Sequence, residues 1–144
     1  MLSIKVQKIN EDALIPKYAH KHDAGMDLYS IREYILKPRH RILVRTGLKL
    51  QVPRGYEMQI RPKSGLALKN GVTVLNTPGT VDSDYRGEIG VILINHSNKS
   101  YRVEKNQKIA QAVFNKIEIA RLTEANKVNR TKRNEGGFGS TGLK

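Results

Sequence analysis

The stretch DSDYRGE, residues 82–88, crowds carboxylates, an aromatic ring and an arginine into one short loop. Asp82 and Asp84 lie two residues apart, so on an extended chain their side chains share one face and can approach one site. Alternatively, one of the two carboxylates forms an ordinary surface ion pair with Arg86, which would contribute little. The stretch directly precedes the apolar run IGVILI, and polar loops on a rigid β scaffold often hold functional sites.

The segment RPKSGLALKNGV, residues 61–72, contains groups that could bind an anion. A helix beginning near Ser64 would present backbone N–H groups, Gly65 would permit close approach, and Lys63 would add a positive charge. The alternative is an ordinary helix that Ser64 caps. An earlier segment, DAGMDLYS, places Asp27 after a glycine turn, where an aspartate usually forms an Asx-turn or a cap.

The last segment, RNEGGFGSTGLK at 133–144, has the composition of a flexible tail but also carries Arg133 and Phe138. Its glycines would let the backbone wrap closely around a ligand, and Ser140 and Thr141 supply hydroxyls. Arg133 offers two parallel donors to a phosphate, and Phe138 could stack on a flat ring. We expect an arm that is mobile alone and closes on a ligand with a ring and phosphates. A solvated tail is the alternative.

Short strands must position these segments. Alternating apolar and polar residues predict half-buried strands in LKLQV at 48–52 and in YEMQIR at 56–61. The apolar run IGVILIN at 89–95 predicts a strand buried on both faces. Further strands are predicted in IAQAVFNKI at 109–117 and, at a sheet edge, in IKVQKI at 4–9.

Glycines and prolines interrupt the chain at short intervals, which is typical of an all-β barrel or sandwich. One short helix is predicted at 64–69, and a weaker helical pattern covers EIARLTEANKV at 118–128. We expect a single domain over residues 1–144, of which about 130–144 form a mobile C-terminal arm.

The charge of the chain favours polyanionic partners. Its 144 residues include 26 basic and 13 acidic side chains, for a formal net charge of +13. There is no cysteine, which excludes disulfides and thiolate zinc sites. The longest apolar run is too short to cross a bilayer, and the start lacks a signal-peptide pattern, so we expect an intracellular protein without a membrane partner.

Taken in order, these segments resemble the five short motifs of the trimeric dUTP diphosphatases, or dUTPases. The matching stretches are AGMDLYS at 24–30, RPKSGLALKNGV at 61–72, NTPGTVDSDYRGE at 76–88, KNQKIAQ at 105–111 and RNEGGFGSTG at 133–142. Ordered motifs over nearly the whole chain are far more specific than one glycine-rich run.

The resemblance implies a β jelly roll with one short helix and a flexible glycine-rich arm. It implies a homotrimer whose active sites are shared between subunits, the arm of one chain closing over a site formed by others. It also implies hydrolysis of dUTP to dUMP and pyrophosphate, with Mg²⁺ bound to the triphosphate. Such a reaction limits uracil incorporation into DNA and supplies dUMP for thymidylate synthesis. We therefore expect a cytoplasmic enzyme.

The resemblance further implies roles for individual residues. Asp82 matches the aspartate that activates water, and Gln111 matches the glutamine near the phosphate and the attacking water. Tyr85 matches the ring under the deoxyribose, which leaves no room for a 2′-hydroxyl. Asp27 would act through ordered water near the metal or support the phosphate loop, and no residue is expected to bind the metal directly. The other matching residues are Lys63, Ser64 and Gly65 at the phosphates, Asn76, Thr80, Val81 and Gly90 at the base, Phe138 over the uracil ring, and Arg133, Gly139, Ser140 and Thr141 in the phosphate clamp.

Three positions depart from the family pattern. Lys63 replaces the usual arginine, which keeps the charge but loses the planar fork, so we expect activity with weaker triphosphate binding. Asn106 and Asn134 replace glycines. Because asparagine tolerates positive φ better than other non-glycine residues, we predict left-handed backbone at both positions.

Two other functions are alternatives. The dCTP deaminases resemble the same fold, but Asp82 and Tyr85 follow the dUTPase arrangement. A non-enzymatic nucleic-acid-binding jelly roll would fit the charge but would leave these two residues and the glycine-rich end unexplained. A weak, salt-sensitive association with nucleic acid beside the catalytic role is a further hypothesis.

Overall fold

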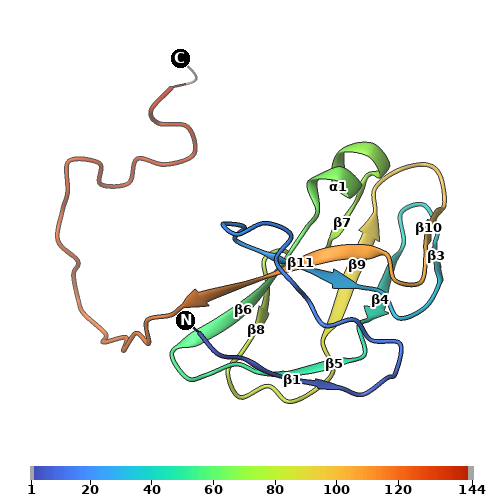
Figure 1. Ribbon diagram of the computed structural model, residues 1–144. Coiled ribbons are helices and arrows are strands. Elements are labelled where there is room, and N and C mark those ends of the chain that lie inside the picture. The colour runs from blue at the N-terminus through green and yellow to red at the C-terminus, as the bar shows by residue number, and fades with distance from the viewer. Residues whose placement is uncertain (1, 143–144) are drawn as a thin grey trace.

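The computed structural model describes residues 2–142 and consists almost entirely of short antiparallel strands (Figure 1). In chain order the elements are β1 (Lys5–Lys8), β2 (Met26–Tyr29), β3 (Tyr34–Leu36), β4 (Arg41–Arg45), β5 (Leu48–Gln51), β6 (Tyr56–Arg61), α1 (Ser64–Asn70), β7 (Val72–Val74), β8 (Gly79–Val81), β9 (Gly90–Asn95), β10 (Tyr101–Val103) and β11 (Lys108–Lys116). Within the described residues the single helix has seven residues, far fewer than a bilayer crossing requires.

The strands form two larger sheets and two strand pairs. One sheet has the order β2-β11-β6-β8, the other β4-β9-β7, and the pairs are β1-β5 and β10-β3. Strand β11 is the centre of the first sheet: it pairs with β6 from Gln111 to Lys116, and with β2 through a register shift between Lys108 and Ala110. Strand β1 pairs only with β5, as predicted for an edge strand.

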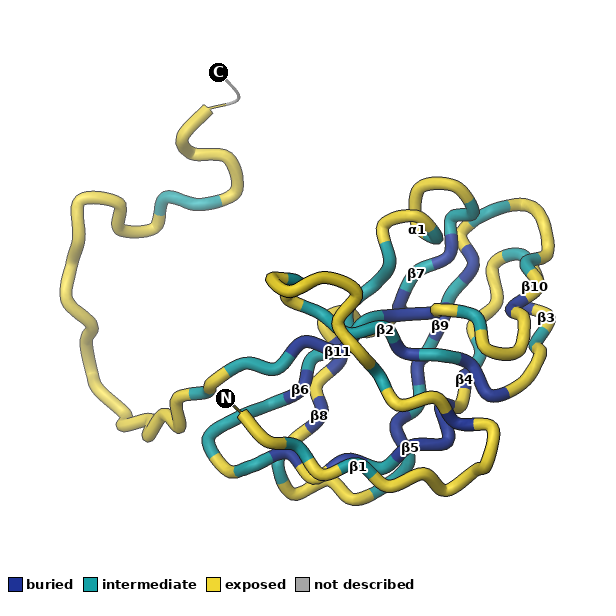
Figure 2. Tube along the Cα trace, viewed as in Figure 1, coloured by how far each residue is buried: buried dark blue, intermediate teal, exposed yellow. Residues whose placement is uncertain are grey.

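The core is built from the inward residues of these alternating strands. In β5 and the residue after it, Leu48, Leu50 and Val52 are buried while Lys49 and Gln51 are not, as the alternation predicts. Figure 2 shows the same alternation along most of the barrel. The all-β prediction is thus confirmed.

The prediction for the strand at 89–95 is wrong in one respect. Val91, Leu93 and Asn95 are buried, but Ile92 and Ile94 are only half-buried, so β9 is not covered on both faces. The outward isoleucines lie on the free face of the β4-β9-β7 sheet, beside the exposed Leu43 that pairs with Ile92. Among residues 2–142 this apolar face is therefore only partly covered.

The weaker helix prediction at 118–128 is also wrong. No helix or strand follows β11 up to residue 142, and this segment leads away from the barrel (Figure 2). Ile119 and Leu122 are 85% and 93% exposed, so the apolar side chains have no surface to pack against. A helix of this length is marginal without such packing.

The predicted short helix is confirmed as α1. Its N-cap is Lys63, with no side-chain cap hydrogen bond, so the interpretation of Ser64 as a helix cap is wrong. Gly71 ends the helix with a left-handed backbone, at φ 64°, and its N–H donates hydrogen bonds to the carbonyls of Ala67 and Leu66.

Candidate active site

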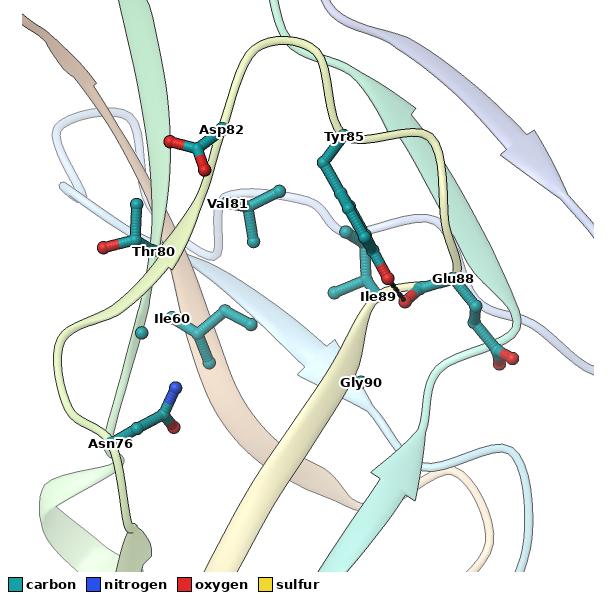
Figure 3. Close-up of a pocket in the computed structure, with 10 residues that line it drawn as sticks. Ile60, Asn76, Thr80, Val81, Asp82, Tyr85, Glu88, Ile89 and Gly90 are labelled. Carbon is teal, nitrogen blue, oxygen red and sulfur yellow. Dashed lines mark hydrogen bonds between the residues drawn. The ribbon is translucent and has the colours of Figure 1, made fainter.

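A cavity of about 160 Å³ lies between β6, β8 and the loop that leads into β9 (Figure 3). We call it the hairpin cavity. Five residues predicted to contact the base or the sugar line it, namely Asn76, Thr80, Val81, Tyr85 and Gly90, together with the predicted catalytic Asp82, whereas Phe138, predicted to lie over the uracil ring, does not. Four further residues line it that the sequence did not single out: Ile60, Gly79, Glu88 and Ile89. Residues of β8 and of the start of β9 thus lie on opposite sides of the cavity (Figure 3).

Glu88 fixes the base of the loop. Its carboxylate accepts hydrogen bonds from Arg45 Nε at 2.7 Å and from the backbone N–H of Gly47 at 2.9 Å. The next residue is held to the same turn, because Thr46 Oγ1 donates to the Ile89 carbonyl at 2.6 Å. The loop therefore enters β9 from a position set by the turn between β4 and β5.

The tip of the loop is held by its own backbone. Arg86 Nη1 donates to the carbonyls of Ser83 and Tyr85, at 2.7 and 2.8 Å, and pairs with neither Asp82 nor Asp84. The alternative of an ion pair between Arg86 and one of these carboxylates is therefore wrong. Asp82 is left exposed at the edge of the hairpin cavity, where its carboxylate can face a ligand or water (Figure 3).

A second cavity, of about 420 Å³, contains Lys63, Ser64, Gly65 and Gln111, the residues predicted to lie at the phosphates outside the arm. We call it the lysine cavity; it is lined by Ala19, His20, Asp23, Ala24, Gly25, Asp27, Lys63, Ser64, Gly65, Lys108 and Gln111. Gln111 connects β11 to this site, because its Nε2 donates to the carbonyl of Pro62, just before Lys63, at 3.0 Å. A side chain at Gly25 would collide with Gln111, since a Cβ there would lie 2.5 Å from Oε1.

Asp27 lies between two lysines. It belongs to strand β2, so the predicted Asx-turn or cap is wrong. Its carboxylate accepts a hydrogen bond from Lys63 Nζ at 2.5 Å and forms an ion pair with Lys108 Nζ at 2.8 Å. The Asp27 side chain is only 12% exposed. Burial alone would raise the pKa of Asp27, but the hydrogen bonds and charges of Lys108 and Lys63 outweigh it and lower that pKa. Asp27 in turn raises the pKa of Lys108, mainly through its hydrogen bond and then through its charge.

We expect Asp27→Asn to lower the free energy of unfolding by roughly 1–3 kcal/mol, because two lysines lose a shared charged partner. The lowered pKa means that the carboxylate stabilises the fold fully above the usual value of 3.8 and loses this effect as pH falls through the lowered value. The difference in melting temperature between wild type and variant should therefore be constant near neutral pH and shrink below about pH 4.

A matched control is Asp12→Asn, which removes an exposed ion pair with Lys105. Surface pairs of this kind contribute little, so its melting temperature should stay within about a degree or two of wild type. A difference for Asp27→Asn that is as small as the control's, or that persists unchanged in acid, would contradict the stabilising role of this carboxylate.

The described part of the arm, up to residue 142, lines neither cavity. Arg133 Nε donates to the carbonyl of its own turn, at Gly136, at 2.7 Å, and Phe138 is fully exposed. Gly139, Ser140 and Thr141, the other predicted clamp residues, also lie in this coil.

Both asparagine predictions are confirmed. Asn106 has φ 63° and Asn134 has φ 48°. Phe138 also has a positive φ, 46°, which the sequence did not indicate. That conformation is uncommon for a bulky residue.

The two cavities share no lining residue, so one chain presents the predicted site in three parts: hairpin cavity, lysine cavity and arm. Lys108 and Glu88 were missed, although both lie within or beside matched motifs, Lys108 in KNQKIAQ. Among residues 2–142 no group of three or more His, Asp or Glu side chains could hold a metal ion.

The family model described as dUTPase matches residues 11–142. The chain belongs to the dUTPase family. It is therefore an enzyme, a nucleotide hydrolase. A curated relative from Alkaliphilus metalliredigens, named deoxyuridine 5'-triphosphate nucleotidohydrolase, is 54% identical over 144 residues and covers all of both chains. A relative of the same name from Nautilia profundicola is 54% identical over 98% of this chain and 99% of its own.

Solved structures agree on the fold. The G164S mutant dUTPase of Staphylococcus bacteriophage 80alpha, with dUpNHpp, is 25% identical and covers 98% of this chain and 99% of its own, with a TM-score of 0.91. The jelly-roll fold that the sequence predicts for the family is thus confirmed.

Proposed function

We propose that this enzyme hydrolyses dUTP to dUMP and pyrophosphate, with Asp82 as the general base. The observation that carries the proposal is the exposed Asp82 carboxylate at the edge of a cavity between β8 and the start of β9, in a chain of the dUTPase family. A water held by Asp82 would attack the α-phosphorus, and catalysis would come mainly from positioning and charge neutralisation. Removal of dUTP and supply of dUMP would follow from this activity.

The hairpin cavity would bind the base and sugar. Its backbone groups along β8 and at Gly90 can distinguish uracil from cytosine by the pattern of donors and acceptors. Gly79 keeps this wall thin, because a Cβ there would lie 3.1 Å from the amide nitrogen of Asn76. A cavity this narrow would exclude the methyl group of thymine.

The lysine cavity would bind the triphosphate. Lys63 and Lys108 supply positive charge, Ser64 a hydroxyl, and Gln111 an amide beside the attacking water. Because Asp27 holds both ammonium groups, the lysine in place of the usual arginine is kept in position although it lacks the planar fork.

The residues fit a magnesium ion that arrives with the nucleotide. Mg²⁺ is commonly bound through one or two carboxylates together with substrate phosphates, and it retains several waters. Both oxygens of Asp27 already accept lysine hydrogen bonds, so Asp27 is suited to a contact through water. When bound, the ion would neutralise charge on the phosphates; the protein's own part is to orient the nucleotide and hold the water at Asp82.

The proposal includes a homotrimer with shared active sites. Support comes from the apolar outer face at Leu43, Ile92 and Ile94, and from the exposed side chains of Ile119 and Leu122, which a second copy would cover. Sedimentation should give three times the chain mass of 16.3 kDa. A monomer at all concentrations would contradict this part of the proposal.

The division of the chain and its location belong to the same proposal. We take residues 1–144 as one domain with a mobile arm from about 130. The absence of cysteine suits a reducing cytoplasm. The association with nucleic acid stays a prediction: a flat binding curve with duplex DNA at low salt would dispose of it.

Pyrophosphate release with Mg²⁺ from dUTP, dTTP, dCTP and UTP tests the activity. We expect rapid release of pyrophosphate from dUTP and not from the other three nucleotides. Ammonia release from dCTP would instead support a deaminase, and no release from any nucleotide would contradict the enzymatic proposal.

A further inference from the structure

We infer that Gly87 positions the Tyr85 ring and so determines how well the enzyme rejects ribonucleotides. This inference rests on the proposed function, in which the ring lies under the sugar. Gly87 touches no proposed substrate group itself and is absent from the lining of the hairpin cavity. It would act only through Tyr85, two residues earlier in the loop.

The ring lies directly against Gly87. A Cβ added to Gly87 would lie 2.2 Å from the Tyr85 hydroxyl oxygen, 2.4 Å from Cζ and 2.9 Å from Cε2. Real Cβ atoms do not approach other atoms this closely, so any side chain at this position would displace the ring. No other glycine of the loop or of the cavity walls meets an aromatic ring in this way.

The backbone does not require glycine at this position. Gly87 is not among the residues with positive φ, unlike Gly47 in the neighbouring turn. An alanine at this position would therefore escape the backbone strain that a left-handed conformation imposes on a Cβ. It is the position of the Tyr85 ring that leaves no room for a side chain at residue 87.

The far end of the ring is also fixed. The Tyr85 hydroxyl donates to the Glu88 carbonyl at 3.0 Å, as Figure 3 shows. The Glu88 side chain is in turn held by Arg45 and by the N–H of Gly47. The ring is thus confined between Gly87 and an acceptor that is anchored to the turn between β4 and β5.

A wall that excludes a single hydroxyl must be placed within a fraction of an ångström. Gly87→Ala would push the ring away from the loop and break its hydrogen bond to Glu88. We expect the ratio of kcat/KM for dUTP to that for UTP to fall about tenfold or more, because small displacements of positioning groups have large effects. The ratio is the useful readout, since general damage to the loop would lower both values together.

The experiment measures both substrates with wild type, Gly87→Ala, Tyr85→Ala and the double variant. If Gly87 acts through the ring, Gly87→Ala should change the dUTP/UTP ratio in the wild-type background and leave it unchanged in the Tyr85→Ala background. Ser83→Ala, in the same loop but outside the cavity, is the matched control and should keep the wild-type ratio.

Two results would overturn the inference: an unchanged ratio in Gly87→Ala, or an equal change in both backgrounds. If Gly87→Ala is too unstable to assay, the double variant decides. Removing the ring removes the collision, so its melting temperature should return to that of Tyr85→Ala, and failure to recover would also overturn the inference. If the wild-type enzyme does not hydrolyse dUTP, the proposed function is contradicted instead.

Discussion

Replacing Asp82 by Asn should slow the turnover of dUTP by a factor of about 10² to 10⁴, the range that a general base contributes. Asparagine has nearly the same shape but cannot accept a proton from water at neutral pH. Asp82 is exposed and forms no ion pair with Arg86, so the fold should not depend on its charge. Single-turnover rates with saturating dUTP would show the loss, and a binding titration should give a dissociation constant close to that of wild type.

Asp84→Asn is the matched control. Asp84 lies two residues away in the same exposed loop but does not line the hairpin cavity. Its variant should retain nearly full turnover and the same melting temperature. Equal losses in the two variants would indicate a general effect of loop charge, and full activity of Asp82→Asn would remove Asp82 from the role of base.

Several of the longer strands could be predicted because burial of one face imposes alternation on four or more residues. This holds for β5 and β6, and the edge strand β1 was found in the same way. Strands β3, β7, β8 and β10 have only three residues each, too few to show a period, and none was predicted; β2 and β4, with four and five residues, were also missed. They are held by partners distant in sequence, for example Tyr101 opposite Leu36.

Two of the wrong structural predictions, for the strand at 89–95 and for the helix at 118–128, share a cause. The isoleucines of β9 and the apolar side chains of the 118–128 segment look from the sequence as if they were buried within this chain. A pattern of apolar residues indicates that their side chains are buried from water, but it does not show whether the same chain or another molecule buries them. If the proposed trimer forms, the cover would come from another copy.

Residue types at the site could be predicted, but their grouping could not. Motif spacing indicated Asp82 and Lys63, yet only the structure shows that they line separate cavities. The ion pair between Lys108 and Asp27 depends on the register between β2 and β11, which local sequence does not specify. The contact between Gly87 and the Tyr85 ring likewise depends on a side-chain orientation within the loop.

Ending the chain at residue 132 should lower kcat/KM for dUTP by about 10²-fold or more. The loss of one preorganised donor to a reacting phosphate costs this much, and Arg133, Ser140 and Thr141 would be removed together. Closure by the arm would also exclude water from the site. Stability should not change, because the hydrogen bonds of Arg133 and of residues 136–142 stay within the arm itself. A melting curve beside the kinetic assay separates these effects.

A mixing experiment then shows whether the arm closes over its own chain. The chain ending at 132 keeps Asp82 but lacks the arm, whereas full-length Asp82→Asn keeps the arm but lacks the base. Each alone should be nearly inactive. If base and arm come from different subunits of a trimer, chains refolded together at equal amounts should regain about a quarter of wild-type activity, because half of the sites have Asp82 and half of those receive an arm. Mixtures as inactive as the separate variants would show that each arm serves the Asp82 of its own chain, and full activity of the chain ending at 132 would show that no arm is needed.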